Sequence, residues 1–307
     1  ECLKVHQRAR LEKEERRQKP EGDRADPEIE FAVPGEERCQ GETKKIGRQH
    51  RFTVGKAGDA AKQPGADAGK GGNVEVWWLG QSAMRITSPT GKVIMIDPWI
   101  LGNPKTPAQY KNLDALGKID LILVTHAHGD HLGDAVALAK KNNVPVWGPA
   151  GLNQQLQTLG ELSAELSPRM NKSGTISPFP GVKITQVHAE HSSEILWTDP
   201  ATKKQHTLFG GEPVGFIIEL ENGFKIYHMG DTGLFGDMKM IGEYYSPDLI
   251  MIPIGGHFVM NPRDAAKATK EYLRPKYAIP MHYATNPFLV GTPAEYVDAL
   301  GGYPVKV

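Results

Sequence analysis

The sequence predicts an α/β fold for residues 74–307, preceded by a charged segment that is expected to be largely disordered. In residues 74–307, short apolar runs with strand preference alternate with segments of helical periodicity. Five of these strands are followed by histidine or aspartate. A histidine placed at random would fall in a helix or a loop as readily as at a strand end, so this distribution indicates one shared site.

The strands are recognised by alternating or continuous apolar residues that end at turn-forming residues. In chain order they are predicted at 74–79, 85–87, 92–96, 121–124, 144–147, 182–187, 215–220, 224–227, 248–254 and 277–281. Helices are predicted at 134–141, 152–162 and 262–273, the last with a proline near its start. Turn residues at 88–91 and 221–223 predict hairpins, and the polar stretch 198–206 predicts a surface loop.

Residues 1–73 differ in composition from the rest of the chain. About 30 of them are Asp, Glu, Lys or Arg, with few large apolar residues between them. We therefore expect residues 1–73 to form a disordered charged segment and linker, with a charged helix near 13–17 as the alternative. Cys2 and Cys39 both lie in this segment and are expected neither to ligate a metal in the folded part nor to cross-link it.

The overall charge balance limits the classes of partner. The formal net charge is +0 at pH 7, so nothing indicates a nucleic-acid-binding surface or an anionic membrane partner. The longest apolar runs are too short to cross a bilayer, which leaves a small-molecule substrate as the expected partner and a homo-oligomer as an open alternative. No secretory signal is recognisable, which favours the cytoplasm. Because the chain begins at Glu1, a periplasmic protein that has lost a presequence is the alternative.

The densest group of reactive side chains follows the predicted strand 121–124. His126, His128, Asp130 and His131 fall within six residues, and such nitrogen and oxygen ligands suit zinc, manganese or iron. They are too many for one tetrahedral site, so two metals are the simplest interpretation. His126 and His128 point to one side of an extended backbone, whereas Asp130 and His131 fall on the following turn and can face a second ion. The alternative is a surface loop rich in these residues by chance.

Other strand ends offer further candidates. Asp97 follows strand 92–96 and is either a turn cap or a carboxylate that orients a metal-bound histidine. His188 and His191 both follow strand 182–187, and His257 follows strand 248–254. Asp231 and His282 come after two further strands.

The motif His126-x-His128-x-Asp130-His131, followed by His191, then Asp231 within Gly-Asp-Thr, and then His282, resembles the metal signature of the metallo-β-lactamase superfamily. Within that superfamily the chain looks closest to the branch known only as metal-dependent hydrolases, which is similar to the ascorbate-6-phosphate lactonase group. The narrower match is carried by residues 78–82, 97–99, 189–193, 228–238, 253–258 and 280–283, and the resemblance covers 74–307.

The resemblance implies a four-layer αββα sandwich with a hydrolase site for two divalent ions at one edge, Zn²⁺ being favoured and Mn²⁺ or Fe²⁺ the alternatives. Carried over residue by residue, it assigns His126, His128 and His191 to the first ion, Asp130, His131 and His282 to the second, and Asp231 to both. A metal-bridging hydroxide would attack a small ester or lactone. The catalytic candidates are Asp130, Asp231 and His257.

Several residues keep two interpretations. The Ala-x-His-Ser pattern favours His191 over His188 as a ligand. His257 has no place among the seven ligands and is either a substrate contact or proton donor, or a structural histidine. Tyr283 is expected to pack rather than to act in catalysis. Gln81 stands where relatives often have histidine, so the sequence does not predict which residue supports the ligands at that position.

The same residues are also compatible with other functions. A phosphodiesterase or nuclease is the first alternative, although RNA-processing relatives carry an extra domain or basic arm for which residues 132–281 leave no room. Weak β-lactamase activity is the second; β-lactamases of the three-histidine type usually lack the acid found here at Asp231, and no cysteine is available for the cysteine-ligand type. The non-enzyme alternative is a redox or vestigial metal-binding protein.

Overall fold

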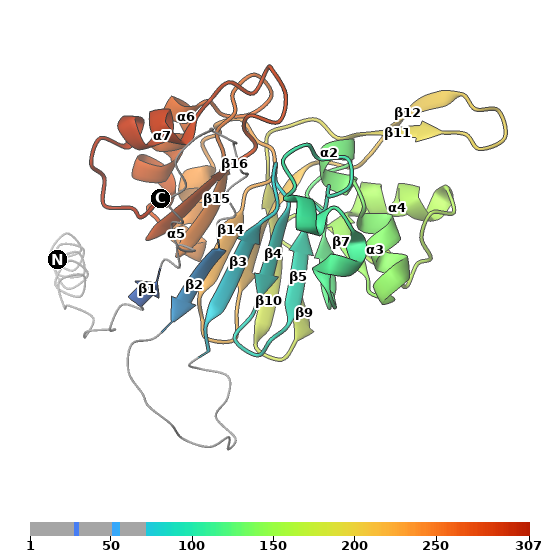
Figure 1. Ribbon diagram of the computed structural model, residues 1–307, viewed down its shortest axis with the longest axis horizontal. Coiled ribbons are helices and arrows are strands. Elements are labelled where there is room, and N and C mark those ends of the chain that lie inside the picture. Colours follow the sequence, from blue (N-terminus) through green and yellow to red (C-terminus); the bar gives the residue numbers. More distant parts are fainter. Residues whose placement is uncertain (1–27, 31–50, 56–71) are drawn as a thin grey trace, which may run out of the picture.

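The computed structural model describes residues 28–30, 51–55 and 72–307. Its centre is a pair of β-sheets (Figure 1). The first sheet contains, in spatial order, β1 (Glu28–Glu30), β2 (Arg51–Gly55), β3 (Val74–Trp78), β4 (Met84–Thr87), β5 (Val93–Ile96), β6 (Leu121–Leu123), β7 (Val146–Pro149) and β8 (Arg169–Met170). The second contains β16 (Tyr277–Met281), β15 (Leu249–Pro253), β14 (Lys225–His228), β13 (Val214–Glu219), β10 (Val182–His188) and β9 (Thr175–Phe179).

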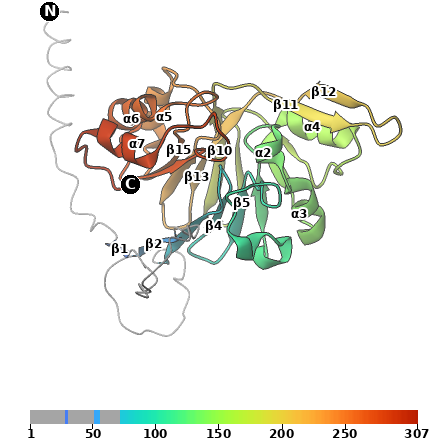
Figure 2. The ribbon, with the colours of Figure 1, turned by 45° about the horizontal axis from the view of Figure 1, so that its top comes forward.

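Helices cover the outer face of each sheet. On the first sheet lie α2 (Gly129–Leu132), α3 (Ala135–Asn142) and α4 (Ala150–Thr158), with the short 3₁₀ turns η1 (Ala108–Tyr110) and η2 (Leu113–Leu116). On the second lie α5 (Met238–Tyr245), α6 (Pro262–Lys267), the π-helical turn η3 (Ala268–Leu273) and α7 (Pro293–Leu300). Figures 1 and 2 both place α3 and α4 on one side of the paired sheets and α5, α6 and α7 on the other.

Three hydrophobic clusters separate these layers. Ile94 and Ile96 of β5 belong to the cluster between the two sheets. Val93 and Met95 of the same strand belong to the cluster under α3 and α4, because successive side chains of a strand point to opposite faces. A third cluster packs the second sheet against α5, α6 and α7. The predicted four-layer αββα sandwich is therefore confirmed.

Strand direction brings the ends of distant segments to one edge. β5, β6 and β7 run parallel in the first sheet, and β14, β15 and β16 run parallel in the second. β10 and β14 are both antiparallel to β13 and so point the same way. The rings of His131 after β6 and His282 after β16 stack with centroids 5.5 Å apart, so the carboxyl ends of both sheets meet.

Two helices begin where side chains satisfy free backbone N–H groups. The Asn261 side chain accepts from the backbone N–H of Arg263 and Asp264, and Pro262 fills the first position of α6. Thr292 and Glu295 form a reciprocal capping box at α7. The helix predicted at 262–273 is thus present, and its second half is the π-helical η3.

One segment differs from the expectation. The polar stretch 198–206 is the tip of a ribbon formed by β11 (Glu194–Thr198) and β12 (Gln205–Phe209), which projects from the body in Figures 1 and 2. Of residues 1–71, the structure describes only two short strands: β1 pairs with β2 and β2 with β3, because the edge of β3 offers unpaired backbone groups. The expectation that residues 1–73 are largely disordered stays a prediction. The expectations for 13–17, Cys2 and Cys39 lie outside the described residues.

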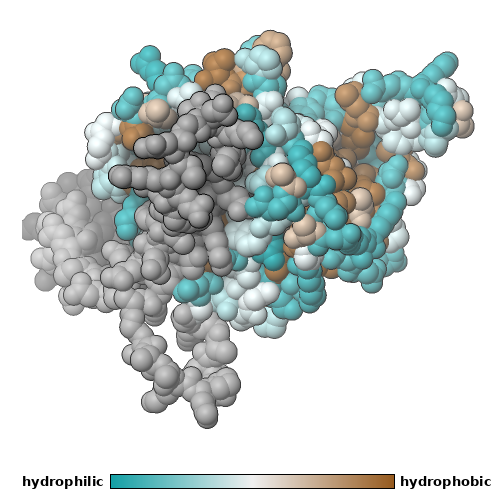
Figure 3. Space-filling model, viewed as in Figure 1, coloured by the Kyte–Doolittle hydropathy of each residue, from teal (hydrophilic) through white to brown (hydrophobic). Residues whose placement is uncertain are grey.

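The described surface in Figure 3 is mostly hydrophilic, with apolar residues in small separate groups. Within the described ranges, no helix has the length and apolar character needed to span a membrane.

Candidate metal centre

The first group of donor atoms comes from three histidines after β6 and β10. His126, His128 and His191 each offer a nitrogen, and these atoms lie within 4.8 Å of one another. His126 Nε2 is 3.0 Å from His128 Nδ1. These two nitrogens are the inner ones. The second, outer nitrogen of each ring has another partner: His126 Nδ1 lies 3.1 Å from Thr125 Oγ1, and His128 Nε2 lies 2.8 Å from the Glu194 carboxylate. The inner nitrogens therefore converge on one point.

The second group combines two carboxylates with two histidines. Asp130, His131, Asp231 and His282 offer atoms that also lie within 4.8 Å of one another. Asp231 Oδ2 is 2.8 Å from His282 Nε2 and 3.2 Å from His131 Nε2. The same oxygen is 3.7 Å from His191 Nε2 of the first group. Asp231 thus lies between the two groups.

Asp97 fixes one ring of the second group. Its Oδ2 lies 2.8 Å from His131 Nδ1 and accepts from Thr125 Oγ1 at 2.7 Å, while its Oδ1 accepts from the Thr125 N–H at 2.8 Å. Both Asp97 and His131 are fully buried. A proton held on Nδ1 leaves the lone pair of Nε2 free for an ion. Of the two interpretations of Asp97, the structure favours the carboxylate that orients a histidine.

The charges at the second group attract a cation. Burial opposes protonation of His131, yet nearby carboxylates, Asp231 foremost, hold its pKa well above the ordinary value. Burial also opposes the charge on Asp231, but His131 and His282 hold its pKa well below the ordinary value. For His282, the same carboxylate outweighs burial and raises the pKa to about 9. In the ion-free protein, the protons on His131 and His282 compensate the negative charge of the buried carboxylates. A divalent ion bound at the same place would compensate that charge with two positive charges.

The donor set fits metal ions. His131 Nε2 and Asp231 Oδ1 are buried and have no hydrogen-bond partner within the described part of the chain, an arrangement that is costly unless a cation completes it. In the first group, burial and the nearby His131 hold the pKa of His126 well below its ordinary value. Neutral imidazole and ionised carboxylate are the forms that bind zinc, manganese or iron.

Comparison with known proteins identifies the family. Residues 92–283 match the beta-lactamase superfamily domain. A UPF0173 metal-dependent hydrolase of Cupriavidus metallidurans is 62% identical over 232 residues, which cover 75% of this chain and 80% of that protein. The chain belongs to the UPF0173 metal-dependent hydrolases. A second such hydrolase, from a Polaromonas species, is 62% identical over 236 residues, covering 77% of this chain and 86% of its own.

Solved structures support the same assignment. Igni18, a metallo hydrolase from the archaeon Ignicoccus hospitalis, is 33% identical with a TM-score of 0.64, over 76% of this chain and 93% of that one. An isothiocyanate hydrolase from Delia radicum gut bacteria is 18% identical with a TM-score of 0.52, over 73% of this chain and 90% of that one, and shares the fold alone. The predicted superfamily and the prediction of a metal-dependent hydrolase are confirmed. The narrower similarity to ascorbate-6-phosphate lactonases stays a prediction.

All seven ligands expected in this UPF0173 hydrolase come together in the two groups. His188 lies outside both groups, beside Lys172 Nζ at 3.1 Å and Glu190 at 3.2 Å. His257 also lies outside them; it is exposed, and its ring stacks on Phe288 with centroids 5.0 Å apart.

Tyr283 stacks on Trp78 with ring centroids 5.2 Å apart, as expected of a packing residue. Sequence reasoning did not single out Glu194, which contacts His128. Because 66 residues separate the two, no local pattern could indicate that contact.

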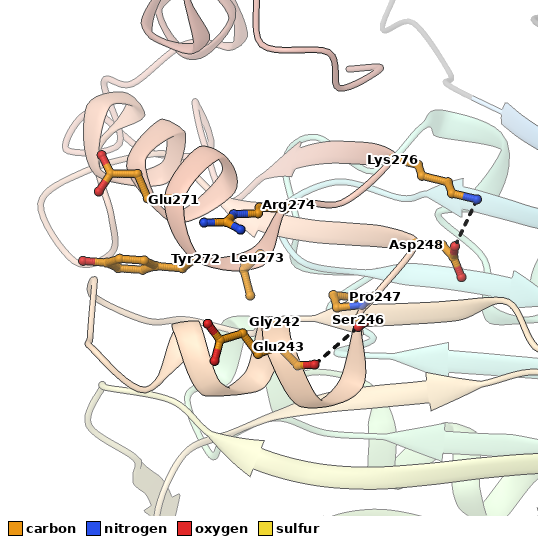
Figure 4. A pocket seen from close by; sticks show the side chains of 10 residues that line it. All are labelled: Gly242, Glu243, Ser246, Pro247, Asp248, Glu271, Tyr272, Leu273, Arg274 and Lys276. Atoms are coloured by element: carbon orange, nitrogen blue, oxygen red, sulfur yellow. Dashed lines mark hydrogen bonds and ion pairs between the residues drawn. The ribbon is translucent and has the colours of Figure 1, made fainter. Parts of the chain in front are cut away.

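A cavity of about 360 Å³ lies elsewhere in this hydrolase, between α5 and η3 (Figure 4). Asp248 and Lys276 line it and immediately precede β15 and β16, so it opens at the amino ends of these strands. Its lining mixes carboxylates with cations and includes none of the seven donor residues. It is therefore separate from the metal centre.

Proposed function

We propose that this protein is a dinuclear hydrolase that acts on a small ester or lactone, with one divalent ion at each donor group and zinc as the favoured ion. The position of Asp231 between the groups carries the proposal. Two ions held there would supply a hydrolytic nucleophile from water at neutral pH and polarise the substrate carbonyl.

The chain's own residues would hold this centre in a fixed geometry. Asp97 orients His131, Glu194 orients His128, and Asp231 reaches both groups. A rigid arrangement of this kind lowers the reorganisation needed during the reaction. The side chain of Asp130 is 32% exposed, which makes Asp130 the most accessible donor of the second group. Substrate would therefore approach the centre from the side of Asp130.

His257 is proposed to contact the substrate. It lies in the loop after β15, and that loop is joined to the loop after β16 by the Gly291 N–H, which donates to the Gly255 carbonyl at 3.0 Å. The exposed rings of Phe258 and Phe288 flank it, with Phe258 at a centroid distance of 4.4 Å. This aromatic group offers an apolar surface on the loops after β15 and β16 for the part of a substrate that does not react.

The proposal is tested by elemental mass spectrometry on protein purified without added metal, followed by a panel of lactone, ester, phosphodiester and β-lactam substrates with and without chelator. Near two zinc or manganese ions per chain and chelator-sensitive ester or lactone hydrolysis are expected. One ion, or iron without hydrolysis, would contradict the proposal, and preferred cleavage of phosphodiesters would favour the nuclease alternative.

A matched pair of variants makes the test specific. His191→Ala is expected to lose the first ion, whereas His188→Ala removes a histidine three residues away that lies outside both donor groups and is expected to keep it. Equal metal contents in the two variants would contradict the assignment of the first group.

A further inference from the structure

Gln81 lies among the donor atoms of the second group, although it is not one of the seven expected ligands. Its side chain is buried, with the residue 1% exposed. The Nε2 atom is 2.9 Å from Asp130 Oδ2 and 2.8 Å from His282 Nε2. Two donor atoms that share one zinc at about 2.1 Å lie about 3.0 Å apart at a right angle and about 3.4 Å apart at the tetrahedral angle. The amide end of Gln81 is therefore spaced close to what a ligand requires.

The backbone of Gln81 is held in an uncommon conformation. Its φ is 51°, in the left-handed region that residues other than glycine rarely adopt. The Gln81 carbonyl accepts from Trp78 Nε1 at 2.8 Å and from the His282 N–H at 3.1 Å, which ties it to the ligand loop. Asp97 and His282 have φ values of 47° and 54°. Strain of this kind persists where the surroundings enforce it, commonly at functional sites.

The Gln81 amide has two possible orientations, which differ in the atom that faces Asp130 and His282. With Nε2 turned inward, its N–H groups point at Asp130 Oδ2 and His282 Nε2, the two atoms that an ion would bind. His282 Nε2 offers a lone pair to an N–H group or to an ion only when the ring is neutral. Turning the amide by half a rotation would place Oε1 inward and the NH₂ group opposite Thr285 Oγ1, which now donates to Oε1. A hydroxyl accepts as well as donates, so Thr285 suits both orientations.

We propose that Gln81 is a further ligand of the second ion, binding through Oε1. The inference rests on the two-ion site of the proposed function. A neutral amide oxygen raises the number of ligands without adding charge, and carbonyl oxygens suit manganese better than they suit zinc. Loss of Gln81 should therefore weaken Mn²⁺ binding more than Zn²⁺ binding.

The test compares wild type, Gln81→Leu and Gln186→Leu. Gln186 is a matched control because it is also fully buried, has neither amide atom hydrogen-bonded among the described residues, and lies outside both donor groups. Chelator competition measures the affinity of each ion, and the visible spectrum of the Co²⁺-loaded protein reports the coordination number.

Gln81→Leu is expected to bind the second ion about 10- to 100-fold more weakly, with a Co²⁺ spectrum of lower coordination and an unchanged first ion. Gln186→Leu should resemble wild type. A wild-type Co²⁺ spectrum in Gln81→Leu would overturn the inference even if binding were weaker, because residues that only orient a ligand cause a loss of the same size. A wild type that takes only one ion would overturn the two-ion site itself, a failure distinct from that of Gln81.

A crystal structure of the zinc-loaded wild type tests the inference without any variant. Oε1 within about 2.0–2.2 Å of the ion supports it. An amide nitrogen that still donates to Asp130, with Oε1 on Thr285, would overturn it.

Discussion

Replacing Asp97 by Asn should weaken the second ion while leaving the fold intact. The carboxylate is fully buried and accepts hydrogen bonds through both oxygens. An amide has one oxygen, so its NH₂ group must face either His131 Nδ1 or the Thr125 N–H. In the first case His131 is driven toward the tautomer with its proton on Nε2, which cannot bind an ion. In the second case a buried donor loses its acceptor.

The expected loss is about 10- to 100-fold in affinity for the second ion, the range typical of groups that orient a metal ligand, or about 1.4–2.7 kcal/mol. Chelator competition with Zn²⁺ measures it for each ion separately. Asp120→Asn is the control, because Asp120 also accepts a backbone hydrogen bond, from Val93 at 3.0 Å, but precedes β6 at the opposite edge. Unchanged affinity in Asp97→Asn, or an equal loss in Asp120→Asn, would show that Asp97 does not orient His131 for the ion.

Four further outcomes are expected. Asp231→Ala should lower the ion count from two toward one and reduce kcat/KM by more than about 100-fold; full activity with two ions would exclude its bridging role. His282 has a pKa of about 9 against an ordinary 6.5. Its protonation therefore stabilises the ion-free fold fully below pH 6.5, and this stabilisation is lost as pH rises through 9. Ion affinity should rise over the same pH interval, because the ion competes with the proton. Calorimetry and chelator competition at several pH values measure both, and flat profiles would contradict this assignment. His257→Ala should raise KM more than it lowers kcat for substrates with an apolar group, whereas an unchanged KM would indicate a structural histidine. Deleting residues 1–73 should preserve ion content and turnover, because the seven donors follow β5 and Gln81 follows β3. It should lower the melting temperature by leaving β3 as the sheet edge; a soluble but inactive truncation would contradict this.

Much of the fold follows from local patterns. Strands such as β5, β6 and β15 are continuous apolar runs because both of their faces are buried, and the start of α6 is marked by Pro262 after the capping Asn261. The strands β1 and β2 were not recognised, because their segment is highly charged and their pairing depends on the edge of β3. The ribbon around 198–206 was not predicted either, because its tip is polar. The residue of β11 that packs into the core, Ile195, lies outside that polar stretch.

Which strands end in donor residues, and which types of donor they carry, can be read from the sequence alone, because strand periodicity and ligand chemistry are local properties. Which of these residues meet depends on the tertiary structure. It brought His191 rather than His188 into the first group, and it placed Gln81 against His282, 201 residues further along the chain. Contacts of that range depend on sheet order and on the paths of the connecting loops, and no local pattern encodes either of them.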